Sequence, residues 1–495
     1  MTEKKFECPH WLKDGVMYQI FPDRFCKSKD YIPPIQNKDY ILREWGEIPE
    51  HLPDSHGVVR NNDFFGGNLQ GIIEKLPYLL ELGVTVIYLN PIFEAYSNHR
   101  YDTANYMKID PMLGTEKDFI QLCKEAKKVG IRIILDGVFN HTGSDSIYFN
   151  KKGRYPNIGA YQSKESIYYS WYRFIDFPEK YESWWGIDTL PSVNETKSSY
   201  LDYIIRNKDS VVKHWLRCGA SGFRLDVVDE LPDIFLDELR RAVKSIDENI
   251  AIIGEVWEDA STKVSYGESR RYLQGAQLDS VMNYPLREAI IRFIGVDGDA
   301  DGFAQVVESL WNNYPETVFY GLMNILGTHD TPRILTLFSE GRSKKESIQK
   351  LFTALILWAM MPGIPCIYYG DEIGMEGGRD PFNRLCFEPD KGNPDIFKHY
   401  KKLMRFRKQV SDMESLEHMK FEPGFTDESL YVFHRKGKKC RLLVSVNADE
   451  KEKLVPLKLK NSESIVNFFI SGDVSFIDFN TFCLKGCSGV AVLIV

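Results

Sequence analysis

One short apolar stretch of the sequence, residues 222–228, carries an arginine and an aspartate at alternate positions, Arg224 and Asp226. Alternate side chains of an extended strand point to the same face, so the two groups are expected side by side. Burying both is costly unless they pair with each other and with further partners. Taken alone, the stretch fits a structural ion pair better than a reaction site.

Other strand-like runs, at 131–141, 251–257 and 321–333, end in polar residues of the same kind. Core packing does not require carboxylates at the ends of several strands. Cleavage of a glycosidic bond does require such a set: one carboxylate as nucleophile, one carboxylic acid for the leaving oxygen, and positive charge nearby. The polar residues at the predicted strand ends are Asn90, Asp136, Asn140, His141, Arg224, Asp226, Glu255, His329 and Asp330.

These side chains meet only if their strands are parallel neighbours. Helical spacing alternates with the strand-like runs, which predicts an α/β fold, a closed (β/α)8 (TIM) barrel whose strands end at one common face. The predicted strands are 16–25, 84–89, 131–139, 222–228, 251–256, 278–283, 322–326 and 364–369. The predicted helices are 69–82, 115–129, 201–216, 232–246, 303–311, 344–360 and 395–408.

Two segments interrupt this alternation and predict further domains. Residues 141–199, after the third strand, are rich in Tyr, Trp, Ser and Gly and are expected to form an inserted domain. Residues 412–495 show short alternating strands with turn signals, which predicts a C-terminal antiparallel β domain, a β-sandwich. The barrel would then comprise residues 1–140 and 200–411.

Composition narrows the class of protein. The 495 residues are 43% hydrophobic and 27% charged, as in globular proteins, and the net charge of −8 argues against nucleic acid or an anionic membrane as partner. No long apolar run follows residues 1–5, and the most apolar stretch, 351–364, is broken by Pro362. Nine cysteines without a CxxC pair favour reduced thiols over a disulfide framework or a zinc site. A cytoplasmic location is expected.

With these residues in place, the chain resembles the α-amylase family of glycoside hydrolases (family 13), from the first strand to the last domain. Asp-Gly-Val-Phe-Asn-His at 136–141 is similar to its first signature, and 222–226 to its second. Gly-Glu-Val-Trp at 254–257 and Gly-Thr-His-Asp at 327–330 are similar to the third and fourth. The motifs occur in the family's order and at predicted strand ends.

The resemblance implies catalytic roles position by position. Asp226 would be the nucleophile that forms a covalent glycosyl-enzyme intermediate. Glu255 would be the general acid and then the base that activates water, and Asp330 would hold sugar hydroxyls and favour the distorted ring. Such a retaining mechanism predicts carboxyl groups of Asp226 and Glu255 about 5–5.5 Å apart.

Substrate contacts are implied for a second set of residues. Arg224 would keep Asp226 ionised, and Tyr101 would stack beneath the sugar. The remaining implied contacts are His141, His329, Trp257, Glu230, Asp380 and Arg384.

Structural roles compete at several of these positions. Asp136 is expected to brace Arg224 rather than to react, and Asn140 is expected to be structural. Glu230 is either a subsite residue or a solvated residue after a strand, and Asp380 with Arg384 is either a sugar contact or a surface ion pair. Trp184 and Trp185 could simply anchor the inserted segment. His141 could cap that segment, but the neighbouring motif favours contact with the ligand.

The segment 190–194, Leu-Pro-Ser-Val-Asn, occupies the fifth signature and is similar to the neopullulanase, cyclomaltodextrinase and amylopullulanase branch. That resemblance implies hydrolysis of α-1,4, and in some members α-1,6, links in maltodextrins, cyclodextrins, pullulan or starch. A transglycosylase of the same family and an inactive sugar-binding homologue remain as alternatives. Ser192 and Val193 differ from the branch's usual pair, so linkage preference stays open.

Two further departures concern assembly and cofactors. The barrel begins without the branch's N-terminal β domain, so a monomer is expected rather than a dimer built through that domain. Calcium, common in the branch, would need oxygen ligands after the first strand, where Lys27 and Lys29 stand. Asp229 and Glu230 replace the usual calcium histidine. No cofactor is expected, with calcium left as a possible but not an expected ligand, and the expected partner is an α-glucan oligosaccharide.

Overall fold

The computed structural model describes residues 6–31, 33, 39–54, 57 and 59–495. Residues 1–5, after which the sequence shows no long apolar run, and parts of the polar segment before Asp63 lie outside this range. Among the described residues, no helix combines the length and apolar character needed to cross a membrane.

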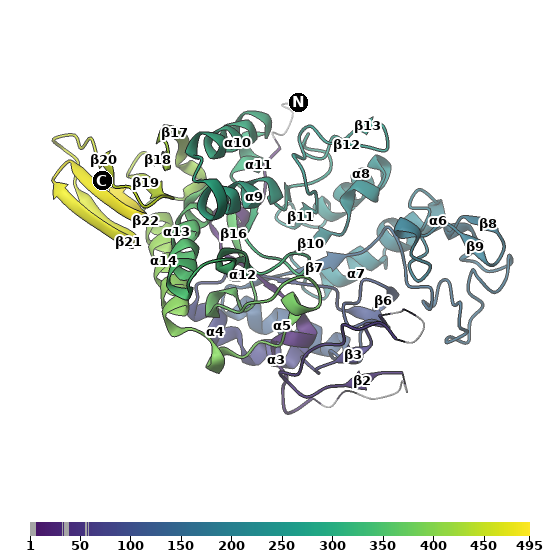
Figure 1. Cartoon of the computed structure of the whole chain (residues 1–495). Helices are drawn as coiled ribbons and strands as arrows, with labels where there is room; N and C mark the ends of the chain where they lie inside the picture. The colour runs from purple at the N-terminus through teal and green to yellow at the C-terminus, as the bar shows by residue number, and fades with distance from the viewer. Residues whose placement is uncertain (1–5, 32, 34–38, 55–56, 58) are drawn as a thin grey trace, which may run out of the picture.

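Eight parallel strands form the centre of the molecule (Figure 1). They are β1 (Met17–Ile20), β4 (Val86–Leu89), β7 (Arg132–Gly137), β10 (Gly222–Leu225), β11 (Ala251–Gly254), β14 (Ser280–Val281), β15 (Met323–Ile325) and β16 (Ile364–Tyr368). They pair in the order β14-β11-β10-β7-β4-β1-β16-β15. A parallel bridge between Met282 and Met323 joins the two outer strands. The ring closes there, which confirms the predicted (β/α)8 barrel.

Strand alternation separates the inside of the barrel from its outside. Met17, Ile134 and Ile253 belong to a small apolar cluster that fills the interior. Their neighbours in sequence, Ile133 and Ile252, belong to the larger cluster that includes the surrounding helices. Because side chains alternate, residues two positions beyond an interior residue also face the barrel axis, at the carboxyl end of the strand.

Helices connect the strands, as predicted, but two of them are divided. Pro77 lies in the first turn of a new helix, so the predicted helix 69–82 becomes two. The predicted helix 201–216 becomes a helical segment to Arg206, a turn at 207–210, and a second helix. The larger connecting helices are α3 (Leu69–Glu74), α4 (Leu76–Glu81), α5 (Glu116–Lys128), α6 (Ser198–Leu201), α7 (Val211–Arg217), α8 (Asp233–Lys244), α9 (Tyr284–Arg292), α10 (Ala300–Asn313), α12 (Ile334–Ser339), α13 (Lys344–Met360) and α14 (Pro394–Met413).

Several strands end earlier than the sequence suggests. The first predicted strand, 16–25, ends at Ile20, and Pro22–Phe25 forms one helical turn, α2. Proline can begin a helix, but it has no N–H to donate within a central strand. The strand predicted at 222–228 ends at Leu225, because the backbone turns left-handed at Val227, with φ of 40°. The strand predicted at 131–139 ends at Gly137.

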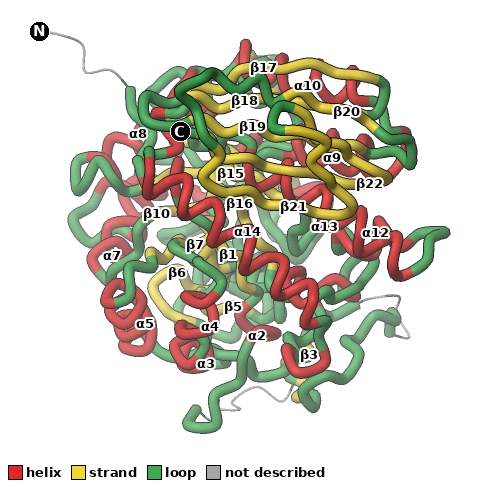
Figure 2. The backbone as a smooth tube through the Cα atoms, turned by 90° about the vertical axis from the view of Figure 1, so that its left-hand side faces the viewer, coloured by secondary structure: helices red, strands yellow, loops and turns green. Residues whose placement is uncertain are grey.

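The two remaining parts lie on opposite sides of the barrel (Figure 1). The segment after β7 contains the short strands β8 (Phe174–Asp176) and β9 (Lys180–Tyr181). The C-terminal strands form one antiparallel sheet, which confirms the antiparallel β fold, while the predicted β-sandwich stays a prediction. The strands are β17 (Lys420–Asp427), β18 (Leu430–Lys436), β19 (Arg441–Asn447), β20 (Lys453–Pro456), β21 (Ile465–Asp478) and β22 (Thr481–Ile494). Figure 2 shows this sheet in front of α13, against which β19, β21 and β22 pack.

Candidate active site

The register of two strands places Arg224 directly beside Asp136. The residues are paired across β10 and β7, and the Arg224 Nη1 group donates to Asp136 Oδ1 at 2.8 Å. The same nitrogen donates to Asp226 Oδ1 at 2.9 Å, so the predicted pairing of Arg224 with Asp226 is confirmed. Asp136 also accepts hydrogen bonds from the hydroxyls of Tyr88 at 2.6 Å and Tyr101 at 2.9 Å. These contacts are those expected of a brace.

Glu255 completes the group from the next strand, β11. Arg224 Nη2 lies 2.8 Å from Glu255 Oε2, and the indole of Trp257 donates to Glu255 Oε1 at 3.1 Å. The backbone N–H of Val227 also donates to Glu255 Oε2, at 2.8 Å. A β-branched residue rarely adopts the left-handed conformation seen at Val227, which stores strain. The turn after Asp226 therefore aims a backbone donor at the second carboxylate.

One arginine thus faces three carboxylates in a buried place. Asp226 is 6% exposed, and burial raises its pKa well above the usual range. The nearby charges of Glu255 and Asp136 raise this pKa further, while Arg224 lowers it. The expected effect of Arg224 on Asp226 is present, but burial and the neighbouring acids outweigh it. Acids that share one guanidinium in a buried place therefore disfavour one another's ionisation.

His329 lies beside this group with a defined tautomer. The amide nitrogen of Gln19, on β1, donates to His329 Nδ1 at 2.9 Å, so Nε2 carries the proton. This Nε2 group lies 2.5 Å from the Tyr101 hydroxyl and 3.0 Å from Asp330 Oδ2. Burial lowers the pKa of His329 well below its usual value, and the charges of Arg384 and Arg224 add to the effect. The imidazole is a neutral donor.

Tyr101 is held from three sides. Its ring stacks on His329 at 5.3 Å with planes 7° apart, and its hydroxyl accepts from the Asn90 amide at 3.0 Å. The third contact is the bond to Asp136 described above. The ring is therefore fixed before any ligand arrives.

His141 presents a free nitrogen from the start of the inserted segment. Its Nε2–H donates to the Tyr101 carbonyl at 3.1 Å, and its ring stacks on Trp184 at 5.4 Å. Its Nδ1 is buried and has no hydrogen-bond partner among the described residues. Burial lowers the pKa of His141 to about 4, so Nδ1 is an unprotonated acceptor at neutral pH. Trp184 supports His141, whereas Trp185 is 79% exposed.

Arg384 contacts both the fourth predicted motif, through His329 and Asp330, and the more exposed Asp380. It donates from Nε to the His329 carbonyl at 2.9 Å, and its guanidinium lies 3.5 Å from Asp330 Oδ1 and 3.0 Å from Asp380 Oδ1. Arg384 is buried, while the Asp330 side chain is 30% exposed and that of Asp380 49%. The Asp380–Arg384 pair is thus not an isolated surface pair. It extends from Asp330 toward solvent.

Glu230 lies farther out, half-buried at the end of the helical turn Val228–Glu230 that follows β10. Its carboxylate accepts from the hydroxyl of Tyr266, in the hairpin formed by β12 (Val264–Ser265) and β13 (Glu268–Ser269). Glu195, just after the fifth signature, is 8% exposed, and burial raises its pKa to about 8, with Glu230 adding to the shift. The sequence analysis did not single out Glu195, because a lone Glu in a polar segment carries no signal.

Two polar groups near the positions where calcium would be expected already have protein partners. Lys263 Nζ lies 2.9 Å from Asp229 Oδ2, so an ammonium group already neutralises this carboxylate. Ser28, in the segment after β1 where calcium ligands would lie, already donates its hydroxyl to Glu74 at 2.6 Å. Asn140 is buried with both amide atoms unpaired among the described residues, but one oxygen is far from the six to eight that Ca²⁺ takes.

Four positioning residues escaped the sequence analysis. They are Gln19, Tyr88, Val227 and Asn383. Asn383 donates to the carbonyls of His329 and Thr331 at 2.7 and 3.0 Å, which fixes the turn that carries Asp330. A polar Gln within an apolar strand was a usable signal; the other three depend on tertiary contacts.

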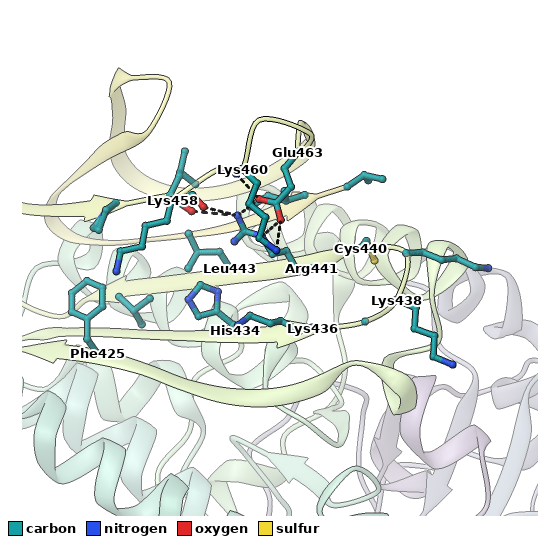
Figure 3. A pocket seen from close by; sticks show the side chains of 17 residues that line it. Phe425, His434, Lys436, Lys438, Cys440, Arg441, Leu443, Lys458, Lys460 and Glu463 are labelled. Carbon is teal, nitrogen blue, oxygen red and sulfur yellow. Dashed lines mark hydrogen bonds and ion pairs between the residues drawn. The ribbon is translucent and has the colours of Figure 1, made fainter.

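A separate hollow of about 470 Å³ lies in the C-terminal sheet (Figure 3). Most of its charged lining is basic, including Lys436, Lys438, Lys458 and Lys460, which extend around the hollow in the close-up. Its single lining carboxylate, Glu463, is held by Arg441 at 2.8 Å. It lacks the paired carboxylates that glycoside cleavage requires, so the chemistry belongs to the strand ends.

Comparisons with known proteins agree with this geometry. The sequence profile described as "Alpha amylase, catalytic domain" matches residues 19–383. An amylopullulanase of Thermoanaerobacter thermohydrosulfuricus is 38% identical over 88% of this chain and 32% of its own length. This chain therefore spans about a third of that relative. A maltogenic alpha-amylase of Bacillus acidopullulyticus is 34% identical over 93% of this chain and 74% of its own.

A solved structure covers nearly the whole chain. The cyclic alpha-maltosyl-(1→6)-maltose hydrolase of Arthrobacter globiformis, in complex with cyclic alpha-maltosyl-(1→6)-maltose, superposes with a TM-score of 0.80. It is 29% identical, and the superposition covers 98% of this chain and all of that one. The likeness thus extends over the barrel, the inserted segment and the C-terminal sheet.

Proposed function

The chain belongs to the alpha-amylase family, and on that premise we propose that it hydrolyses α-glucosidic bonds with retention of configuration. The observation that carries the proposal is the position of Arg224 between two carboxylates on neighbouring strand ends. Its two terminal nitrogens lie 2.9 Å from Asp226 and 2.8 Å from Glu255. A double displacement requires two carboxyl groups close together, and here one guanidinium holds both.

In the first step, a carboxylate oxygen of Asp226 attacks the anomeric carbon, and the bond from that carbon to the leaving oxygen breaks. Glu255 gives its proton to the leaving oxygen, so the released sugar departs as an alcohol. Arg224 stays close to both groups as negative charge leaves Asp226 and develops on Glu255. This mechanism requires the two carboxyl groups to lie about 5–5.5 Å apart, as predicted from the sequence.

In the second step, Glu255, now ionised, takes a proton from water while the water oxygen attacks the anomeric carbon. The bond to Asp226 breaks and the carboxylate is restored. Two inversions at one carbon give net retention. The Val227 N–H and the Trp257 indole, which both donate to Glu255, hold it at the same place for both steps.

The surrounding groups suit the binding of one sugar ring. Neutral His329 offers an Nε2–H, neutral His141 offers an unpaired Nδ1, and Asp330 offers carboxylate oxygens. Tyr101, fixed on His329, gives the flat face on which a sugar would stack. Arg384, Asp380 and Glu230, which lie farther out, are proposed to contact neighbouring sugars.

The substrate is proposed to be an α-glucan oligosaccharide with α-1,4 links, with α-1,6 cleavage as a further activity. Amylopullulanase, maltogenic alpha-amylase and the cyclic maltosyl-maltose hydrolase are all named for glucans of this class. Transfer of the glycosyl group to a second sugar is the competing outcome, in which a sugar hydroxyl replaces water in the second step. An inactive sugar-binding role is disfavoured because no group needed for the reaction is missing.

The protein is further proposed to act in the cytoplasm, as a monomer, without a catalytic metal. All nine cysteines are unpaired, which suits a reducing compartment. Acid, base and nucleophile are all supplied by side chains, so the reaction needs no metal. Light scattering after size exclusion tests the monomer, and unchanged kcat after chelator treatment tests the metal.

Product analysis tests the proposed activity. Purified protein is incubated separately with maltotriose, pullulan, β-cyclodextrin and soluble starch, next to the Asp226→Asn variant, and the products are separated by chromatography. Maltose or panose from the smaller substrates, with starch cut slowly, supports the proposal. Products longer than the substrate favour transfer, and no product from any of the four overturns it.

A further inference from the structure

A second cluster of reactive side chains lies outside the barrel centre, between α5 and α7. Glu116, His214 and Cys218 each offer one metal-type ligand atom, and these atoms all lie within 4.8 Å of one another. His214 Nε2 is 2.9 Å from Glu116 Oε2 and 3.7 Å from Cys218 Sγ. No other such group of three occurs among the residues that the structure describes.

The local structure explains why these residues meet. His214 and Cys218 are four residues apart at the end of α7, so they share one face of the helix. Glu116 is the first residue of α5, where Asp118 and Thr115 form the capping box and leave the Glu116 carboxylate available. Phe119 packs edge-on against Trp215 at 5.5 Å and fixes the two helices side by side.

The spacing is close to that of a zinc site. Zn²⁺ binds carboxylate oxygen at about 2.0 Å, imidazole nitrogen at about 2.05 Å and thiolate sulfur at about 2.3 Å. At a tetrahedral angle, these lengths place nitrogen about 3.3 Å from oxygen and about 3.5 Å from sulfur. The observed 2.9 and 3.7 Å differ by a few tenths of an ångström. The oxygen of Glu116 and the sulfur of Cys218 lie within 4.8 Å of each other, and a rotamer change of the half-exposed Glu116 side chain would bring them to the roughly 3.5 Å that the ion requires.

The ligand types and their exposure also suit such an ion. Cysteine and histidine select Zn²⁺ over Mg²⁺ or Ca²⁺, which prefer oxygen ligands alone. The side chains of His214 and Glu116 are 21% and 45% exposed, so an ion can enter from solvent. Spacing along the sequence hid this site, because Glu116 and His214 are 98 residues apart and no CxxC pair is involved.

We propose that Glu116, His214 and Cys218 bind a divalent ion of the zinc type, with water as the fourth ligand. The ion joins α5 to α7, the helices that lead into β7 and β10, and these two strands carry Asp136 and Arg224. Its role is to fasten two neighbouring β/α units and not to take part in catalysis. A hydrogen-bonded His–Glu pair beside an ordinary thiol is the alternative.

Cobalt titration distinguishes the two. Tag-free protein is stripped with chelator and titrated with Co²⁺, whose thiolate bond gives a near-ultraviolet charge-transfer band and whose tetrahedral site gives strong visible bands. The proposal predicts both bands, saturating at one ion per chain, and their displacement by Zn²⁺. Absence of both bands, or visible bands without the thiolate band, overturns it.

Variants locate the site. Cys218→Ser should abolish the thiolate band, and His214→Ala and Glu116→Gln should each weaken Zn²⁺ binding by more than about 100-fold, beyond the loss typical of an outer-sphere partner. Cys487→Ser, a cysteine in the C-terminal sheet, is the control and should bind like the unmodified chain. Equal loss in the control, or bands unchanged in Cys218→Ser, overturns the proposal.

A stability measurement gives an independent readout. Zn²⁺ should raise the melting temperature of the unmodified chain and of Cys487→Ser, but not that of Glu116→Gln, whose exposed side chain is not needed for folding. Hydrolysis by Glu116→Gln should equal that of the unmodified chain at 25 °C. A zinc-dependent rise of equal size in Glu116→Gln contradicts the proposal.

Discussion

At the carboxyl ends of β7, β10 and β11, three carboxylates surround Arg224, whereas at the amino end of β14 one carboxylate, Asp279, faces two cations. Asp279 is fully buried and accepts from Arg240 Nη1 at 2.9 Å and Lys244 Nζ at 2.7 Å. It also accepts from the Ile252 N–H at 2.9 Å. Every oxygen of Asp279 has a donor, and cations outnumber acids.

The contrast shows how to tell a reaction site from a structural one in the same barrel. Ion pairs are buried at both the carboxyl and the amino ends of the barrel strands, so a buried ion pair alone does not identify a functional site. At the Arg224 end, acids outnumber the cation and burial raises the pKa of Asp226, an arrangement that disfavours full ionisation of the three acids. At the Asp279 end, both carboxylate oxygens are paired with cations, and Ile252 adds a backbone N–H.

The largest effect is expected for Asp226→Asn. The amide can still accept from Arg224 Nη1, but it cannot form the glycosyl-enzyme, so kcat/KM should fall by about 10⁴-fold or more. The melting temperature should not fall, because the substitution removes a carboxylate whose pKa burial raises. Initial rates on maltotriose and a thermal melt measure both. Activity within tenfold of the unmodified chain would contradict the assignment of Asp226 as the nucleophile.

Asp279→Asn should show the opposite pattern. The neutral amide leaves Arg240 and Lys244 without their counter-charge, so the free energy of unfolding should drop by about 4 kcal/mol. The kcat of the folded protein at 25 °C should not change, since Asp279 lies at the far end of the strands. Urea denaturation and kcat measure the two quantities. A lower kcat with unchanged stability would contradict the division between the two ends.

Glu372 sharpens the comparison, because it is a buried carboxylate without a cation. It accepts from the hydroxyls of Tyr18 at 2.8 Å and Tyr78 at 2.7 Å, and burial raises its pKa to about 7 from 4.5. The folded protein therefore holds this proton more tightly than the unfolded chain. The resulting stabilisation is complete below about pH 4.5 and is lost as the pH rises through 7.

Glu372→Gln should remove that dependence. Between pH 5 and pH 8, the free energy of unfolding should fall by about 3 kcal/mol less in the variant than in the unmodified chain. Urea titrations at the two pH values, with Asp279→Asn as a second variant that keeps Glu372, measure the difference. Parallel pH profiles for Glu372→Gln and the unmodified chain would show that Glu372 is ionised when folded.

The smallest effect is expected for Val227→Gly. Glycine adopts the left-handed conformation freely, so the protein should be more stable by about 1 kcal/mol. The kcat should fall a few-fold, because the N–H that holds Glu255 is less firmly aimed. Val227→Ala, which keeps a Cβ in the strained conformation, should retain kcat. Loss of stability in Val227→Gly with full activity would show that the turn serves packing only.

Periodicity was enough to predict the barrel, because apolar strands and amphipathic helices alternate along the chain. It could not locate the ends of strands, where backbone turns such as the one at Val227 are set by contacts with Glu255 from another strand. The lengths of two helices were predicted wrongly for local reasons. Proline divides one of them, and a turn divides the other.

The residues proposed to react could be selected from the sequence because each lies at a strand end and occurs in a recognisable motif, and their roles stay a prediction. The raised pKa of Asp226 was not predictable, since it depends on burial and on how many acids share Arg224. Gln19 and Asn383 were missed for a related reason. Their function is to fix His329 and its turn, and that is visible only when distant segments are brought together.

The most direct test of the account is a search for the covalent intermediate in Glu255→Gln. Maltosyl fluoride, a donor whose leaving group needs no acid, should still react with Asp226, while the second step is slow without its base. Intact-protein mass spectrometry should then show a gain of one maltosyl unit, and peptide mapping should place it on Asp226. An adduct on another residue, or rapid turnover of maltosyl fluoride by Asp226→Asn, would contradict the assignment of Asp226 and Glu255 to their two roles.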